Sequence, residues 1–71
     1  MNTINPNKLH NSKWTAAQPR NKEKHFIVTK LLRNEEEQVV EVVIEAVHSN
    51  REITLAWQEL TDASVWKMGW K

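Results

Sequence analysis

Three apolar stretches follow one another along the middle of the chain, and each has the length and composition of a β-strand. Residues 25–33 and 39–47 are rich in β-branched and aromatic side chains, and residues 51–57 alternate between polar and apolar positions. Polar segments separate the three stretches. The pattern predicts a mainly β fold built on a three-stranded antiparallel meander.

The second stretch also fits a helix. Asn34 and Glu37 have the spacing of a capping box, and acidic residues favour a first helical turn. Against this, residues 39–44 include five β-branched side chains, which are stiff at χ1 and pack better on a pleated surface. We therefore predict a strand over 39–47.

Strands two and three are expected to meet across a tight turn at Ser49-Asn50, because Asn tolerates a positive φ. Such a turn places the apolar positions of the two strands on one face, which defines the core. The predicted neighbours are Ile53 with Ala46, Leu55 with Ile44, and Trp57 with Val42. The other face is not cleanly polar, because Val39, Val43 and Val47 leave a partly apolar stripe.

Strand one has two competing registers, because the geometry of the 34–38 connection is unknown. The preferred register buries the large ring. It brings Phe26, Val28 and Leu32 to the core face and leaves Lys30 at the margin. The other register brings Ile27, Thr29 and Leu31 there and sets Lys30 opposite Glu41, where an exposed charge pair contributes only about 0.2–1 kcal/mol.

The two ends of the chain are less regular. Residues 1–12 are polar and are predicted to be a flexible tail, with residues 13–71 forming one small domain. The segment before strand one is expected to be extended and to dock the Trp14 ring. Thr61-Asp62 is a plausible N-cap for a short helix or turn over 62–68, which Gly69 would end.

Composition adds limits on stability and location. The chain has 71 residues and no cysteine, which excludes disulfides and thiolate zinc sites. A domain of this length buries only about 60% of the surface of its unfolded chain, so its core is marginal. Its four tryptophans are expected to complete that core or to form a binding surface. No apolar run approaches the ~20 residues of a membrane span, and residues 1–12 lack a secretory segment, so a cytoplasmic protein is expected.

Charge is divided unevenly along the chain. Residues 1–33 carry seven Lys and Arg side chains against one acid, Glu23, whereas residues 34–62 carry eight acids against one base, Arg51. The formal net charge of the whole chain is only +1. Two interpretations follow: the basic half binds an acidic partner, or it faces the acidic strands within the same molecule.

Several spaced motifs together resemble a known family. They are Lys8-Leu9-His10, Ser12-Lys13-Trp14-Thr15, Lys24-His25-Phe26, Val28-Thr29-Lys30, Glu45-Ala46-Val47, Arg51-Glu52, Trp57-Gln58-Glu59-Leu60, and Trp66 with Gly69-Trp70. The chain resembles the small bacterial Trp-rich proteins of unknown function over nearly its whole length. The resemblance implies a stand-alone bacterial protein, complete from Met1 to Lys71, and implies no activity.

Among function classes, the pattern favours a non-enzymatic protein-interaction module that presents a sheet edge or the apolar stripe to an unknown protein partner or to its own copy. The alternative is a nucleic-acid-binding protein, in which cations follow phosphates and exposed rings stack on bases. The candidate binding residues are Lys13, Trp14, Lys22, Lys24, Lys30, Trp66 and Trp70.

Catalytic and metal chemistry find little support in the sequence. The single glycine excludes a glycine-rich phosphate loop, and no nucleophile motif surrounds Ser12, Ser49 or Ser64. The spacing of the three histidines matches no ligand pattern. We therefore expect no catalytic residues, no metal and no cofactor.

Overall fold

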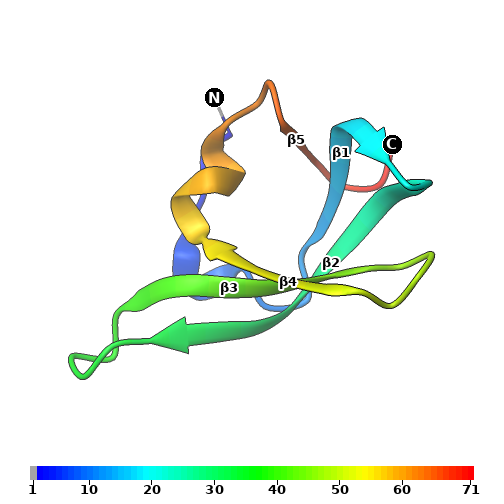
Figure 1. Cartoon of the computed structure of the whole chain (residues 1–71). Helices are drawn as coiled ribbons and strands as arrows, with labels where there is room; N and C mark the ends of the chain where they lie inside the picture. Colours follow the sequence, from blue (N-terminus) through cyan, green and yellow to red (C-terminus); the bar gives the residue numbers. More distant parts are fainter. Residues whose placement is uncertain (1) are drawn as a thin grey trace.

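The computed structural model describes residues 2–71 and contains five antiparallel strands in one sheet (Figure 1). The strands are β1 (Lys13–Arg20), β2 (Glu23–Arg33), β3 (Val39–Ala46), β4 (Glu52–Ala56) and β5 (Trp66–Met68), in the order β4-β3-β2-β1-β5. Two 3-10 turns are added, η1 (Pro6–Lys8) and η2 (Trp57–Thr61). The mainly β class is confirmed, but the meander has five strands, not three.

The sheet curls around its core. After β4, at one edge of the sheet, the chain crosses to the opposite edge, where β5 lies beside β1. The segment η2 makes this crossing, and β5 then pairs with β1 (Figure 1). The core is built from side chains of every strand except β4, whose apolar residues are partly buried against it. Its largest fully buried side chains are Trp14, Ile44, Leu60, Val28 and Val42.

The strands β3 and β4 pair on the predicted faces, but their register is shifted by two residues. The observed neighbours are Ile53 with Ile44 and Leu55 with Val42. The cause is a longer loop than the predicted two-residue turn, because residues 47–51 all leave the ladder and Asn50 has a φ of 60°. A shift of two residues keeps every side chain on its face. Trp57 lies beyond the ladder, begins η2, and is half-buried against the core.

The strand β2 follows neither predicted register along its whole length. A β-bulge interrupts the ladder between Val28 and Lys30, so the face that points to the core changes at Thr29. Before the bulge, Phe26 and Val28 are buried, as the preferred register predicts. After it, Leu31 packs against the core in place of Leu32.

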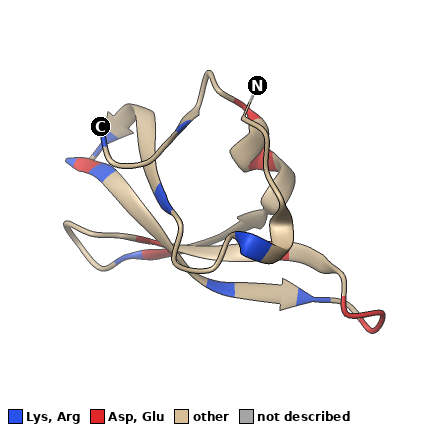
Figure 2. Ribbon diagram, turned by 180° about the vertical axis from the view of Figure 1, so that it is seen from behind, with Lys and Arg blue, Asp and Glu red and all other residues tan. Residues whose placement is uncertain are grey.

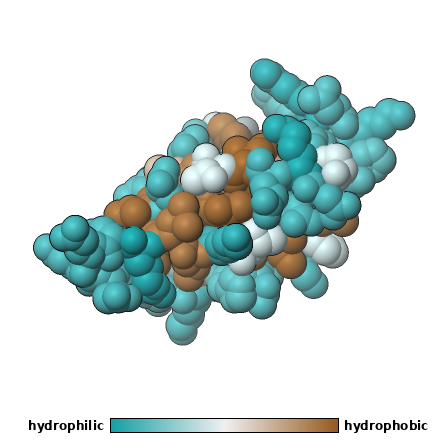
Figure 3. All heavy atoms as spheres, turned by 60° about the horizontal axis from the view of Figure 1, so that its bottom comes forward, coloured by the Kyte–Doolittle hydropathy of each residue, from teal (hydrophilic) through white to brown (hydrophobic). Residues whose placement is uncertain are grey.

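The outer face of β2, β3 and β4 contains only part of the predicted apolar stripe. Val39 belongs to the core, Val43 is 9% exposed opposite Lys30, and Val47 is 45% exposed in the loop after β3. Seen from this side, apolar side chains gather in the middle of the molecule, between hydrophilic ends (Figure 3). Lys30 thus lies on the outer face, not at the core margin or opposite Glu41.

Both ends of the sheet depart from the predicted irregular structure. The segment that was expected to dock Trp14 is the strand β1, in which Trp14 is 1% exposed. Of the short helix or turn predicted over 62–68, the structure has a turn at residues 63–65 and no helix, and β5 follows with Trp66 opposite Ala16. A helix this short is marginal in water, whereas the free edge of β1 offers backbone partners. Gly69, at a φ of 79°, ends β5.

Residues 2–12, predicted to be a flexible tail, contact the rest of the fold, and a disordered tail is not shown. Leu9 is 4% exposed in the core, and the Asn11 amide donates to the carbonyl of Val28 at 2.9 Å. The Asn2 side chain donates to the carbonyls of Leu60 and Trp66, both at 2.8 Å. The N-terminal segment thereby joins η2 and β5 from outside the sheet.

A leucine substitution tests whether this segment belongs to the folded core. We expect Leu9→Ala to lower the free energy of unfolding by about 2–4 kcal/mol, because it leaves a cavity against the core. Urea denaturation followed by circular dichroism measures the change. The control is Lys8→Ala, an exposed neighbour expected to stay within about 0.5 kcal/mol of the parent. A free tail would make the two variants alike.

Candidate functional site

The three tryptophans predicted for a binding surface have different environments. Trp14 is in the core, and its indole N–H donates to Ser12 Oγ at 2.8 Å. Trp66 is 9% exposed and meets Phe26 edge to face, with ring centroids 5.1 Å apart. Trp70 is 44% exposed. Only Trp70 offers much of its ring to a partner.

Trp70 lies on the outside of β1 and β2, where the chain folds back after Gly69. Its indole N–H donates to the carbonyl of Phe26 at 3.0 Å, and its ring is 5.8 Å from that of His25. The Lys13 ammonium lies 4.8 Å from the ring centroid, which is a cation–π contact. Lys13 and Trp70, two of the candidate binding residues, are therefore neighbours, but each is already engaged with the other.

The remaining predicted lysines do not line one groove with this pair. Lys22 is in the turn between β1 and β2, where Asn21 and Lys22 both have a positive φ, and Lys24 follows it. Lys30 is on the outer face of the sheet. The β1–β2 turn and the acidic turn at 35–37 lie at opposite ends of the molecule (Figure 2). The cations are thus dispersed.

A cleft of about 440 Å³ lies between the start of β2, the 47–51 loop and the turn before β5. We call it the arginine cleft. It is lined by Ala16, Gln18, Arg20, Glu23, Phe26, Arg51, Ser64, Val65 and Trp66. Its apolar wall consists of Ala16, Phe26, Val65 and Trp66, and its cations are Arg20 and Arg51. The cleft therefore combines apolar surface with two guanidinium groups.

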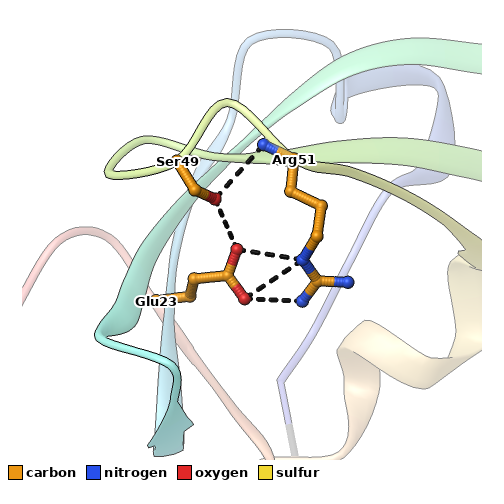
Figure 4. A network of polar contacts seen from close by, with 3 residues as sticks. All are labelled: Glu23, Ser49 and Arg51. Atoms are coloured by element: carbon orange, nitrogen blue, oxygen red, sulfur yellow. Dashed lines mark hydrogen bonds and ion pairs between the residues drawn. The ribbon is translucent and has the colours of Figure 1, made fainter.

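One carboxylate fixes the position of Arg51 in this cleft (Figure 4). Glu23 is only 4% exposed, and its two oxygens accept from Arg51 Nη2 at 2.6 Å and Nε at 3.0 Å. The hydroxyl of Ser49 also donates to Glu23 and accepts from the Arg51 amide at 3.3 Å. The Arg51 side chain nevertheless stays 54% exposed. The buried acid thus holds an accessible guanidinium in a fork geometry.

The same contacts perturb the titration of Glu23. The hydrogen bond from Arg51, followed by that from Ser49, lowers the pKa of Glu23 from 4.5 to about 2. The Arg51 pKa is raised by its hydrogen bond to Glu23. On the opposite side of the cleft, the side chain and amide of Ser64 donate to Asp62, which lowers the pKa of Asp62 and braces the turn that carries Val65.

Sequence reasoning missed this network, although the charge pattern contained a signal for it. Glu23 is the one acid among residues 1–33, and Arg51 is the one base among residues 34–62. Each is the exception in its own half of the chain, and the two exceptions pair with each other. This ion pair is not the contact expected from the second interpretation, in which basic residues of the first half face acidic residues of the second half.

Comparison with known families identifies the chain. A family model described as Tryptophan-rich protein (DUF2389) matches residues 12–71. The chain belongs to this family. The resemblance to the Trp-rich proteins is confirmed, and membership assigns a domain of unknown function without an activity. No curated protein and no solved structure gave a significant match.

The part matched by the Trp-rich family includes all five strands, all four tryptophans and the whole arginine cleft. Within residues 2–71, no group of three or more His, Cys, Asp or Glu side chains is placed to hold a metal ion. In the same described part, no helix has the length and apolar character needed to cross a membrane.

The lowered pKa of Glu23 predicts a stability change in acid. Because the folded pKa lies below the ordinary value, the stabilisation is complete above about pH 4.5 and is lost as the pH falls through about 2. We expect Glu23→Gln to be less stable than the parent at pH 7, and the difference to shrink across that window. Thermal denaturation at a series of pH values measures it.

The matched control is Glu52→Gln, an exposed carboxylate next to Arg51. Its stability profile is expected to stay parallel to that of the parent from pH 7 to pH 2. A gap between Glu23→Gln and the parent that did not change with pH would contradict the assigned ion pair.

Proposed function

We propose that this Trp-rich protein is a non-enzymatic interaction module and that the arginine cleft receives a segment of a protein partner. The carrying observation is the buried Glu23 carboxylate, which holds Arg51 in place while half of that side chain stays accessible. Positioned guanidinium groups beside apolar surface are typical of binding hot spots, where Arg and aromatic residues predominate. A fixed group also loses less entropy on binding.

The titration of Glu23 supports a binding role over a catalytic one. A general base is most effective when its pKa is near the working pH, whereas the pKa of Glu23 is about 2. The Ser49 hydroxyl donates to this weakly basic carboxylate, so it lacks the adjacent base that activates a serine nucleophile. The network is well suited to positioning a cation.

The surfaces favoured by the sequence alone are weaker candidates. In the predicted apolar stripe, Val39 and Val43 are buried and only Val47 is well exposed. For nucleic acid, Trp14 and Trp66 expose too little ring to stack on bases, which is where single-strand binders gain about 1–3 kcal/mol per base. The cleft brings charge and apolar surface together, so it is the better interaction site.

The test is selection of ligands without a prior choice of partner. A displayed library of random heptapeptides is panned against the full chain, and selected peptides are titrated into ¹⁵N-labelled protein. We expect the largest shifts at the Trp66 indole, the Arg51 Nε–H and the Val65 amide, which belong to the cleft.

A matched pair of variants separates the cleft from the rest of the surface. Val65 lines the cleft at 47% exposure, and Val47 lies outside it at 45% exposure. We expect Val65→Trp to block the selected peptides and Val47→Trp to leave their affinity unchanged. Peptides that shift signals outside the cleft, or that bind both variants equally, would overturn the proposal.

A further inference from the structure

We infer that the arginine cleft, as the peptide site proposed above, recognises a carboxylate. The carboxylate belongs to an acidic residue of the partner that lies next to a bulky apolar side chain. The two arginines bind the carboxylate, and the apolar wall contacts the neighbouring side chain. This deepens the proposed function and rests on it. It assigns a ligand chemistry to residues 20 and 51 that nothing in the family description supplies.

The charge balance in the cleft leaves one guanidinium without a counterion. Arg51 is paired with Glu23, whereas Arg20 is exposed and has no ion pair with any residue from 2 to 71. Three charged residues line the cleft, so its net charge is positive. An anionic ligand therefore complements it, and a neutral or cationic one does not.

Hydrogen-bond donors are also available in the cleft. Glu23 uses only Nε and Nη2 of Arg51, and among the described residues no acceptor bonds to Nη1. The Arg20 guanidinium adds a further set of donors at the same cleft. Guanidinium groups match carboxylates in plane and spacing, so both oxygens of a ligand carboxylate can be satisfied.

The apolar wall argues for a peptide over a nucleic acid. Phe26 is 4% and Trp66 is 9% exposed, so neither ring offers a face for base stacking. The exposed part of the wall is Val65, at 47%, which can contact an aliphatic side chain of a peptide. No lysine lines the cleft: Lys13 is held over Trp70, Lys30 is on the outer face of the sheet, and Lys22 and Lys24 are in the β1–β2 hairpin outside the lining. A long polyanion would find only two cations here.

The experiment compares short probes of one length by NMR titration of the full chain. The first probe is acetyl-Gly-Leu-Glu-Leu-Gly-amide, the second has Gln in place of Glu, and the third has Ser in place of both Leu. We expect the first to shift the Arg51 Nε–H and Trp66 indole signals, and the other two to bind about tenfold more weakly, because a charged acceptor or the apolar contact is lost.

Two variants identify the cation involved. Arg20→Gln and Lys22→Gln each remove one positive charge from the same hairpin, but only Arg20 lines the cleft. We expect Arg20→Gln to abolish the preference for Glu over Gln and Lys22→Gln to keep it. Equal loss in both variants would mean a general charge effect and would overturn the inference.

The remaining outcomes are also decisive. Equal binding of the Glu and Gln probes in the cleft would overturn the carboxylate inference and leave the peptide site standing. Stronger binding of inorganic phosphate or of an oligouridine would assign the cleft to phosphate groups. NMR signals of the cleft could also shift with protein concentration when no peptide is added. If changing residues 35–37 to Gln removed these shifts, the cleft would be assigned to the acidic turn of a second copy. Absence of cleft shifts with these probes and with the selected peptides would overturn the proposed function itself.

Discussion

Replacing Trp14 by alanine is expected to lower the free energy of unfolding by about 3–5 kcal/mol, the usual cost of removing a fully buried indole. Trp14 is 1% exposed and lies on β1 between Phe26 of β2 and Met68 of β5, so it joins the two halves of the curled sheet. A chain of 71 residues has a total stability of about 4–10 kcal/mol. The variant is therefore expected to retain little folded population.

Urea denaturation followed by far-ultraviolet circular dichroism measures this change, because tryptophan fluorescence itself is altered. The matched control is Trp70→Ala, which removes the same side chain at 44% exposure. That variant loses the contact with Lys13 and the hydrogen bond to Phe26, about 1–2.5 kcal/mol in total. Equal costs for the two substitutions would refute the assignment of Trp14 to the core.

Local composition was sufficient to predict the central strands. In β3 the β-branched residues outweigh a capping-box signal at Asn34 and Glu37, and the structure has a strand there with a polar turn before it. Asn34 does use its side chain, accepting hydrogen bonds from the amides of Glu36 and Gln38, but it closes a turn between strands. Strand composition therefore decided the outcome over a capping motif.

Register and the edge strands could not be predicted in the same way, because they depend on distant partners. The sequence pattern of β2 gives no sign of the bulge at Thr29. Because of this bulge, Leu31 packs against the core in place of Leu32. Likewise β5 is only three residues long, and its pairing with Trp14 to Ala16 spans about fifty residues of sequence. Local propensity in such a short segment is too weak to oppose the tertiary contact.

Of the residues that line the arginine cleft, the sequence indicated only Trp66 as a candidate, and the charged residues Arg20, Glu23 and Arg51 were missed. Sequence reasoning concentrated on tryptophans beside lysines, and the fold then buried Trp14 and most of Trp66. Glu23 and Arg51 are 28 residues apart and carry no motif. They meet because the 47–51 loop is longer than the predicted turn and folds toward the start of β2. Local composition does not predict a loop conformation of this kind.

The crossing from β4 to β5 depends on a single buried side chain. Leu60 is 0% exposed and is the one buried residue of η2. Outside the core, Asn2 binds the Leu60 carbonyl, so the crossing is held from both sides. We expect Leu60→Ala to cost about 2–5 kcal/mol, because it opens a cavity in the core.

The loss is expected to be uneven across the sheet, which gives the prediction a local test. Since η2 delivers the chain to β5, amide hydrogen exchange should accelerate first at Trp66 and Lys67, and the amides shared by β2 and β3 should remain protected until global unfolding. Val40→Ala, at a 40% exposed position, serves as the control. Uniform acceleration throughout the sheet would show that η2 and β5 do not open separately. Early exchange confined to β5 would instead show that one wall of the arginine cleft is on the least stable part of the fold. That wall includes Trp66, the first residue of β5, and Val65, which precedes it.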